Sequence, residues 1–278
     1  MRWIDFTPYI RTLSTDLVRV KAPPSTLDVV ISAGGMRGMY ACGLMYLLRD
    51  CGTRVRRIYG ASVGALIGLA FVCDISLHHM RMAYECLAED GPKKKAILTT
   101  LEECIREWLP SDAYVRCSDR LFITVSEFQS YGRFRKHVVS RFSDNDDLIQ
   151  AVMASAALTY ITTDSKGYVE FRGMRCMDGY YCLATNDGMP DAQRTNGVPL
   201  LHINLLHVSD YSVFKTLSAT DPYIDSLILR GIQDAYRFLI GDESIKSAAP
   251  VFYWTPPVFG IIAQVRRLGA LAYHLLLP

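Results

Sequence analysis

The sequence has 278 residues, of which 50% are hydrophobic and 21% charged, and its formal net charge is +2. This length suits one large domain or two small ones with a sizeable core. The mixture of apolar and charged residues excludes a disordered or collagen-like chain. Because the net charge is close to zero, the chain lacks the strong basic excess typical of nucleic-acid binding, and we expect no nucleic-acid partner.

Three features bear on the compartment. No stretch of about 20 apolar residues is free of charge, so a membrane-spanning helix is not expected. The first eleven residues do not have the pattern of a signal peptide, because Asp5 and Pro8 interrupt their only apolar stretch. The eight cysteines form no Cys-x-x-Cys pair, which favours reduced thiols over disulfides or a zinc site. These observations predict an intracellular, cytoplasmic protein.

The beginning of the chain is predicted to be irregular. Pro8, Pro23 and Pro24 interrupt its helical patterns. We therefore expect residues 1–26 to lie across the surface without regular structure.

From residue 27 onward, strand patterns alternate with helical patterns, and the first two strands each lead into a glycine turn and a helix. We predict strands at 27–31, 55–59, 121–126, 134–140 and 198–208. We predict helices at 38–48, 60–73, 75–89, 101–108, 148–157 (capped by 144–147) and 221–240. This order predicts an α/β sandwich with a parallel sheet over 27–210, followed by a helical, apolar extension over 211–278.

The sharpest chemical signal is Gly60-Ala61-Ser62-Val63-Gly64, which follows a predicted strand and opens a predicted helix. This is the context of a nucleophile elbow, in which a serine on a strained turn needs small neighbours on both sides. The helix N-terminus behind Ser62 favours developing negative charge. The alternative is a glycine-bounded turn whose serine only caps a helix.

A second glycine-rich turn, Ser32-Ala33-Gly34-Gly35-Met36-Arg37-Gly38, also joins a strand to a helix. Successive backbone N–H groups at such a turn form a concavity suited to an oxyanion. A dinucleotide site is the competing interpretation. Its Gly-x-Gly-x-x-Gly spacing is absent, however, and no Walker-type Gly-Lys-Ser/Thr occurs.

The third signal is Asp178-Gly179. An Asp-Gly pair is usually only a turn, and a second pair, Asp187-Gly188, follows closely. Asp178 becomes a candidate because a nucleophile elbow requires a base.

Together the three motifs resemble those of the patatin-like phospholipases. That family has a Gly-Gly-Gly-x-Arg/Lys-Gly loop, then a Gly-x-Ser-x-Gly elbow, and an Asp-Gly-Gly/Ala turn far downstream. Here the corresponding segments are 33–38, 60–66 and 178–179, and 146–156 resembles the family's helix before an Ala-Ser-x-x-x-Pro segment. Segments 58–62, 121–125 and 233–239 are similar to the animal-type, adiponutrin-like branch. The resemblance covers about residues 27–240.

This resemblance implies a patatin-like catalytic domain, a three-layer α/β/α sandwich with a largely parallel central sheet. By position, Ser62 is the nucleophile and Asp178 the residue that activates it, in a dyad without histidine. Gly34, Gly35, Met36 and Arg37 form the oxyanion hole, with added positive charge from Arg37. No metal or other cofactor is implied.

Three positions depart from the family pattern. Ala33 replaces the first glycine of the loop, which is tolerable if its φ is negative. Tyr180 replaces the small residue after Asp178-Gly179, and its ring narrows the acyl site if it points inward. Leu158-Thr159 lacks the usual proline.

The implied function is a lipid acyl hydrolase of the phospholipase A or acylglycerol lipase type, acting through an acyl-enzyme. Its substrate is a phospholipid or acylglycerol, met at a membrane or lipid-droplet surface with which the protein associates peripherally. Two alternatives remain open. One is an α/β-hydrolase esterase with a Ser-His-Asp triad, for which His202, His207 or His274 follows Asp178. The other is a catalytically impaired lipid-binding protein.

Two further segments have open interpretations. The apolar residues 251–262 and 268–277 either insert at a lipid surface or pack onto the core as a terminal helix. Arg54, Arg56 and Arg57 either contact phospholipid headgroups or mark a charged strand at the edge of the sheet.

Overall fold

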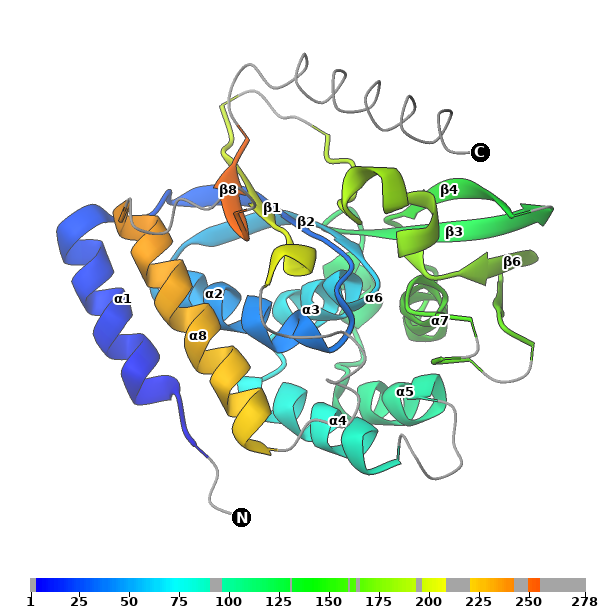
Figure 1. The fold of residues 1–278 in the computed structure, drawn as a ribbon, viewed down its shortest axis with the longest axis horizontal. Helices are drawn as coiled ribbons and strands as arrows, with labels where there is room; N and C mark the ends of the chain where they lie inside the picture. The colour runs from blue at the N-terminus through cyan, green and yellow to red at the C-terminus, as the bar shows by residue number, and fades with distance from the viewer. Residues whose placement is uncertain are drawn as a thin grey trace, which may run out of the picture.

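The computed structural model describes residues 4–90, 97–130, 132–159, 161–163, 166–193, 197–208, 221–242 and 250–255. Within these residues eight strands form one sheet (Figure 1). The strands are β1 (Thr26–Ile31), β2 (Arg54–Ala61), β3 (Leu121–Ser130), β4 (Arg133–Val139), β5 (Val169–Phe171), β6 (Met174–Met177), β7 (Leu200–Ile203) and β8 (Phe252–Trp254). Their order is β5-β6-β3-β2-β1-β7-β8, and β4 also pairs with β3.

The centre of the sheet is parallel and its margins are antiparallel. Strands β7, β1, β2 and β3 run in one direction, whereas β4 and β6 pair with β3, and β8 pairs with β7, in the opposite direction. Parallel strands need crossover connections, and helices supply them here. The predicted mixed α/β fold with a mostly parallel central sheet is confirmed.

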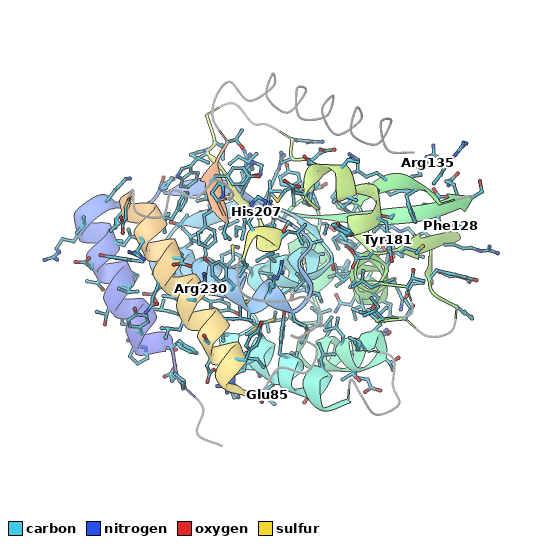
Figure 2. All side chains as sticks on the ribbon, in the orientation of Figure 1. Glu85, Phe128, Arg135, Tyr181, His207 and Arg230 are labelled. Atoms are coloured by element: carbon cyan, nitrogen blue, oxygen red, sulfur yellow. The ribbon has the colours of Figure 1, made fainter. Side chains whose placement is uncertain are left out.

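Helices pack against the sheet and enclose a continuous apolar core, which the side chains in Figure 2 fill. The α-helices are α1 (Thr7–Lys21), α2 (Gly38–Asp50), α3 (Val63–Val72), α4 (Leu77–Asp90), α5 (Ile97–Trp108), α6 (Ala113–Cys117), α7 (Asn145–Ser155) and α8 (Asp221–Ile240). Four short 3-10 helices are η1 (Gly35–Arg37), η2 (Gly179–Cys182), η3 (Ala184–Asn186) and η4 (Leu205–His207).

Strand β1 shows how both faces of the sheet are covered. Leu27, Val29 and Ile31 belong to the main core with the helices, whereas Val30 packs on the opposite face with Tyr59 and Met189. Burial on both faces is typical of parallel strands and explains why β-branched residues follow one another at 29–31 in β1.

The N-terminal segment is not irregular, contrary to the prediction for residues 1–26, because Thr7–Lys21 forms a helix. Pro8 lies in its first turn, where the missing N–H would have no intrahelical acceptor. Ile10, Ser14 and Leu17 are buried on one face, and α1 packs against α2 and α8.

The chain beyond residue 210 is also more closely joined to the core than predicted. Helix α8 is confirmed at 221–240 and packs along α2. Phe252–Trp254, predicted as part of a helical extension, instead form β8 on the edge of β7. An aromatic run has high strand propensity, and it satisfies the backbone groups that β7 would otherwise leave unpaired. Residues 256–278, including most of the predicted apolar segment, lie outside the described residues.

Two smaller predictions are corrected. Strand β7 is shorter than the predicted 198–208, because the Asn204 side chain accepts a hydrogen bond from Leu206 N–H and the chain turns into η4. Strand β2 is not at an edge, since it lies between β1 and β3. Arg56 of β2 forms hydrogen bonds of 3.0 and 2.6 Å with the buried Asp28 of β1.

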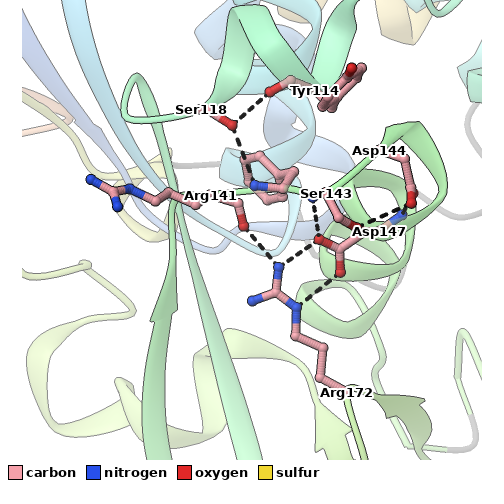
Figure 3. A network of polar contacts seen from close by, with 8 residues as sticks. Tyr114, Ser118, Arg141, Ser143, Asp144, Asp147 and Arg172 are labelled. Atoms are coloured by element: carbon pink, nitrogen blue, oxygen red, sulfur yellow. Dashed lines mark hydrogen bonds and ion pairs between the residues drawn. The ribbon is translucent and has the colours of Figure 1, made fainter.

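A polar network fixes the start of α7 (Figure 3). Asp144 Oδ1 accepts a hydrogen bond from Asp147 N–H (2.8 Å), which confirms the predicted cap. Asp147 in turn accepts from Ser143 N–H (3.0 Å) and from the Arg172 guanidinium at 2.9 and 2.6 Å. Arg172 also donates to the Arg141 carbonyl. The network holds the N-terminus of a helix whose last residue, Ser155, reaches the candidate site.

We expect Asp144→Ala to lower the free energy of unfolding by about 1 kcal/mol, because the Asp147 N–H loses its acceptor. Asp144→Asn is the matched control and should stay within about 0.5 kcal/mol of the parent, since asparagine caps helices as well as aspartate does. Urea unfolding of the three proteins measures both values. Equal losses in the two variants would contradict the capping role.

Candidate active site

Ser62 lies on a strained turn between β2 and α3. Its backbone has φ 56° and ψ −128°, a conformation that non-glycine residues rarely adopt. The flanking glycines permit the turn. A Cβ at Gly60 would lie 2.5 Å from the backbone of Gly64, and a Cβ at Gly64 would lie 2.5 Å from the Ile31 carbonyl oxygen. The local geometry predicted for a nucleophile elbow is therefore present.

The structure brings Asp178 against this serine, 116 residues away in sequence. Ser62 Oγ donates a hydrogen bond of 2.6 Å to Asp178 Oδ2. The other carboxylate oxygen, Oδ1, accepts from the Tyr180 N–H at 2.8 Å. Both side chains are buried, and Asp178 has no exposed surface. Asp178 follows β6 and begins η2, so the end of one strand faces the elbow at the end of another.

Burial shifts the protonation of Asp178. Loss of water around the carboxyl raises its pKa to about 7, although the hydrogen bonds from Ser62 and from the Tyr180 N–H act in the opposite direction. A carboxyl poised near neutrality can both accept and return a proton under ordinary conditions.

Two buried serines hold the pair in place. Ser155 Oγ accepts from the Ser62 N–H (2.9 Å) and donates to the Thr124 carbonyl (2.7 Å). Ser126 Oγ donates to the Asp178 carbonyl at 2.8 Å. Sequence reasoning assigned neither serine to the site. The only signal was the position of Ser155 in the Met-Ala-Ser-Ala segment.

The glycine-rich turn lies beside Ser62 as expected, but its four candidate residues differ in placement. Gly34, Gly35 and Met36 line the same cavity as Ser62. Arg37 is not among the residues that line this cavity. Its N–H donates to Gly34 O within the turn, and its guanidinium donates to the carbonyls of Leu205 and Leu206. The Arg37 side chain thus fastens the turn to η4.

Ser62 and Asp178 line an apolar cavity of about 380 Å³. Its lining includes Leu66, Leu69 and Ala70 of α3, Met80, Ala83, Tyr84 and Leu87 of α4, and Ile97, Leu98, Leu101, Ile105 and Trp108 of α5. Ile161, in the loop after α7, also lines it and is 39% exposed. A cavity of this composition suits a hydrocarbon chain.

The three departures from the family pattern are accommodated. Ala33 is not among the residues with positive φ, so its methyl group causes no backbone strain, and it packs with Ala61 and Leu183. The Tyr180 side chain lines the cavity near Asp178. Leu158, where the chain turns without proline, donates its N–H to Thr162 Oγ1 at 2.8 Å.

The candidate triad histidines within the described chain contact residues other than Ser62 and Asp178 through their side chains. His202 hydrogen-bonds to Thr255 and stacks on Tyr253, with 4.7 Å between ring centroids. His207 Nδ1 lies 3.1 Å from the Pro250 carbonyl oxygen. Neither hydrogen-bonds to Ser62 or Asp178. His274 lies outside the described residues.

In the ranges given above, no group of three or more His, Cys, Asp or Glu side chains is placed to hold a metal ion.

Among the described residues, no helix has both the length and the apolar character needed to span a bilayer.

Comparisons with known proteins find similar sequences. Residues 29–89, which contain the glycine-rich turn and the elbow, match the family model described as Patatin-like phospholipase. The chain is 29% identical over 191 residues to human "Patatin-like phospholipase domain-containing protein 5", covering 63% of this chain and 42% of that protein. It is 28% identical over 271 residues to rat "Patatin-like phospholipase domain-containing protein 2", covering 83% and 54%. The chain thus spans about half the length of the curated relatives it matches.

We expect Asp178→Asn to stabilise the fold relative to the parent at pH 8 but not at pH 5. The folded-state pKa of about 7 lies above the usual 3.8, so the parent loses stability as pH rises from about 4 to 7, on the order of 2 kcal/mol between pH 5 and pH 8. The side-chain amide of asparagine cannot ionise, so the Asp178→Asn variant does not lose stability in this way as pH rises. Thermal unfolding at the two pH values measures the difference.

Asp147→Asn is the control for that experiment. The Arg172 guanidinium holds the pKa of Asp147 below its usual value, so Asp147 is ionised in the folded protein at both pH 5 and pH 8. Its replacement should cost the same stability at both. A pH-independent effect of Asp178→Asn would contradict the raised pKa.

Proposed function

We propose that this protein is a lipid acyl hydrolase in which Ser62 and Asp178 form the catalytic dyad. The observation that carries the proposal is the 2.6 Å hydrogen bond from a strained elbow serine to a buried carboxylate in the lining of an apolar cavity. The matches to patatin-like phospholipases support it. As part of the same proposal we place the chain in the animal-type, adiponutrin-like branch.

The first half-reaction forms an acyl-enzyme. Ionised Asp178 accepts the Ser62 hydroxyl proton while Oγ attacks the ester carbonyl carbon, and the electron pair of the C=O bond moves to oxygen. The N–H groups of Gly35 and Met36 open the 3-10 turn and have no acceptor inside it. We assign them to the oxyanion, because the N–H of Arg37 already binds Gly34 O.

The tetrahedral intermediate then collapses, the C–O bond to the alcohol breaks, and Asp178 returns its proton to the leaving oxygen, which completes the acyl-enzyme. In the second half-reaction water attacks the acyl carbon of the Ser62 ester while Asp178 accepts a proton from it. This second intermediate collapses, the bond between the acyl carbon and Ser62 Oγ breaks, Asp178 returns the proton to Oγ, and the fatty acid leaves. Since the pKa of Asp178 is about 7, the carboxyl can accept and return protons near neutral pH, where its pKa is close to the pH of the solution.

The substrate class follows from the cavity. Its wall is built almost wholly from aliphatic and aromatic side chains of α3, α4 and α5, which favours a fatty-acyl chain with the ester at Ser62. We propose a phospholipid or acylglycerol substrate, met at a membrane or lipid-droplet surface by a cytoplasmic protein that associates with it peripherally. The proposed chemistry uses no cofactor.

We expect Ser62→Ala and Asp178→Asn each to lower acyl-ester hydrolysis by a factor of roughly 10² to 10⁴. The double variant should be hardly worse than either single one, because nucleophile and base act as a unit. A fluorophosphonate probe should label the parent at Ser62 and leave Ser62→Ala unlabelled. Hydrolysis of a lipid panel and mass spectrometry of the labelled peptide provide the measurements.

Asp187→Asn is the matched control, because Asp187 also precedes a glycine but lies exposed on the next loop. It should retain the activity of the parent. His202→Gln and His207→Gln separate the dyad from a triad, since a general base accounts for ~10²–10⁴ of the rate. A thousandfold loss in either, with the fold intact, would establish the triad esterase instead. A parent that fails to react with the probe would indicate a lipid-binding protein without catalysis.

The pH dependence should follow the ionisation of Asp178. The carboxyl must be deprotonated to accept the Ser62 proton, so kcat/KM should rise with pH, with its midpoint at about 7, and then level off. A profile already flat from pH 5 upward would show that Asp178 is ionised far below neutrality and would contradict its role as a base poised by burial. Initial rates on a short-chain ester, which is soluble across this range, give the profile.

A further inference from the structure

Strand β3 extends well beyond the edge of the sheet where the candidate site lies. Strand β2 ends at Ala61, opposite Thr124 of β3, and Ser62 follows directly. Met177, which precedes Asp178, pairs with Ser126. Residues 125–130 of β3 continue past the end of β2, and at about 3.3 Å per residue they reach about 20 Å further. The β3–β4 hairpin therefore overhangs the edge that carries Ser62 and Asp178, and Figure 1 shows β3 and β4 projecting from the body of the protein.

An aromatic row connects the site to the end of this hairpin. Tyr181, three residues after Asp178, stacks on Phe134 of β4 with 5.1 Å between ring centroids, and Phe134 contacts Phe128 of β3 at 6.0 Å. Phe128 is 37% exposed, and Val138 on the same face is 47% exposed. Figure 2 shows Phe128 and Arg135 at the protruding end of the hairpin and Tyr181 nearer the body of the protein.

The same end carries positive charge that no acidic group of the described structure neutralises. Arg133 and Arg135 are exposed and form no hydrogen bond or ion pair with a described residue. Glu127, the cross-strand neighbour of Arg135, binds His137 instead, and Lys136 is paired with Asp191. Two free guanidinium groups thus accompany the aromatic side chains.

We propose that the end of the β3–β4 hairpin docks on an anionic phospholipid surface. Aromatic side chains settle at the interface between headgroups and acyl chains, and each arginine close to an anionic leaflet adds electrostatic attraction. Phe128 and the arginines lie on opposite faces of the hairpin. Phe128 pairs with Phe134, and Arg133 and Arg135 are the sequence neighbours of Phe134, so their side chains point to the other face. A surface that meets the hairpin end-on is therefore contacted by both.

Docking in this orientation turns the candidate site toward the lipid. Because the hairpin projects from the edge of the sheet where Ser62 lies, the surface that holds its end also faces that edge. Ile161, which lines the cavity and is partly exposed, belongs to the loop whose Ala157 carbonyl accepts the Asp178 N–H. The biological purpose of docking rests on the proposed lipid hydrolase function, but the binding itself does not require catalysis.

The test measures vesicle binding with Ser62→Ala as the parent, so that hydrolysis plays no part. Co-sedimentation uses vesicles of phosphatidylcholine alone and with about 30% phosphatidylserine. Arg133→Glu/Arg135→Glu should weaken binding to the anionic vesicles at least tenfold, since each arginine near such a surface contributes ~1 kcal/mol. Binding of the parent should also fall as salt rises from about 50 to 500 mM.

Arg11→Glu/Arg54→Glu is the matched control. Both arginines are exposed, one on α1 and the other at the opposite end of the sheet, so the same change in net charge should leave binding within about twofold of the parent. Phe128→Gln tests the aromatic contribution and should weaken binding to both kinds of vesicle. Thermal unfolding verifies that each variant is folded.

The results separate docking from nonspecific attraction. If the hairpin double variant binds anionic vesicles as tightly as the parent, the proposal is wrong. If the control double variant loses as much binding, net charge and not the hairpin is responsible, and the proposal is equally wrong. Loss in the hairpin variants alone supports it. A failure of the hydrolase proposal would appear in the ester assays and would leave this binding result unchanged.

Discussion

The buried carboxyl of Asp178 is the constraint around which the site is arranged. A carboxylate without exposed surface is costly unless its oxygens are hydrogen-bonded, and here Ser62 Oγ and the Tyr180 N–H satisfy one oxygen each. Ser126 holds the backbone carbonyl of the same residue. Burial raises the pKa of Asp178 to about 7. The hydrogen bond from Ser62 that compensates for this burial also connects the end of β6 to the end of β2.

The same constraint explains why rigid elements surround the pair. Ser155, at the end of α7, links the Ser62 N–H to the Thr124 carbonyl of β3, while Asp144 and Asp147 fix the start of that helix. Because hydrogen bonds hold both ends of α7, Ser155 is fixed in place. The backbone of Ser62, to which Ser155 binds, therefore has little freedom to relax its strain. Strain of this kind persists only where its surroundings over-determine it.

Two different surroundings meet at Ser62. One is the apolar cavity, and the other is the end of the β3–β4 hairpin with its exposed arginine and aromatic side chains. Helices α4 and α5 contribute most of the apolar wall, whereas the site edge carries the overhanging hairpin with its exposed Phe128 and Arg135. In the proposed function, the apolar wall would hold the acyl chain and the hairpin would hold the lipid surface. An ester would then reach Ser62 and Asp178 from one direction. Both proposed uses of the molecule depend on the parallel strands ending at one edge.

Local sequence determined much of the fold. The β-branched run of β1, the glycines around Ser62 and the cap at Asp144 act within a few residues, so these strands, turns and helices were predictable close to their observed bounds. The short elements β5, β6 and α6 were not predicted. The prediction that residues 1–26 are irregular was wrong for α1. Pro8 lies in the first turn of that helix, where proline is tolerated, whereas a proline in the interior of a helix is not. Residues 252–254 were misassigned because a strand at a sheet edge is stabilised by its neighbour, which the linear sequence does not show.

For the site, the sequence by itself indicated Ser62, Asp178 and the glycine-rich turn through short motifs. Tertiary structure alone decided that Ser62 Oγ and an Asp178 oxygen lie 2.6 Å apart, that Arg37 binds the carbonyls of η4, and that Ser126 and Ser155 complete the arrangement. The physical reason is distance along the chain. Contacts between residues 62, 126, 155 and 178 depend on how the sheet orders its strands, and a serine hydroxyl in sequence carries no sign of the partner it will meet.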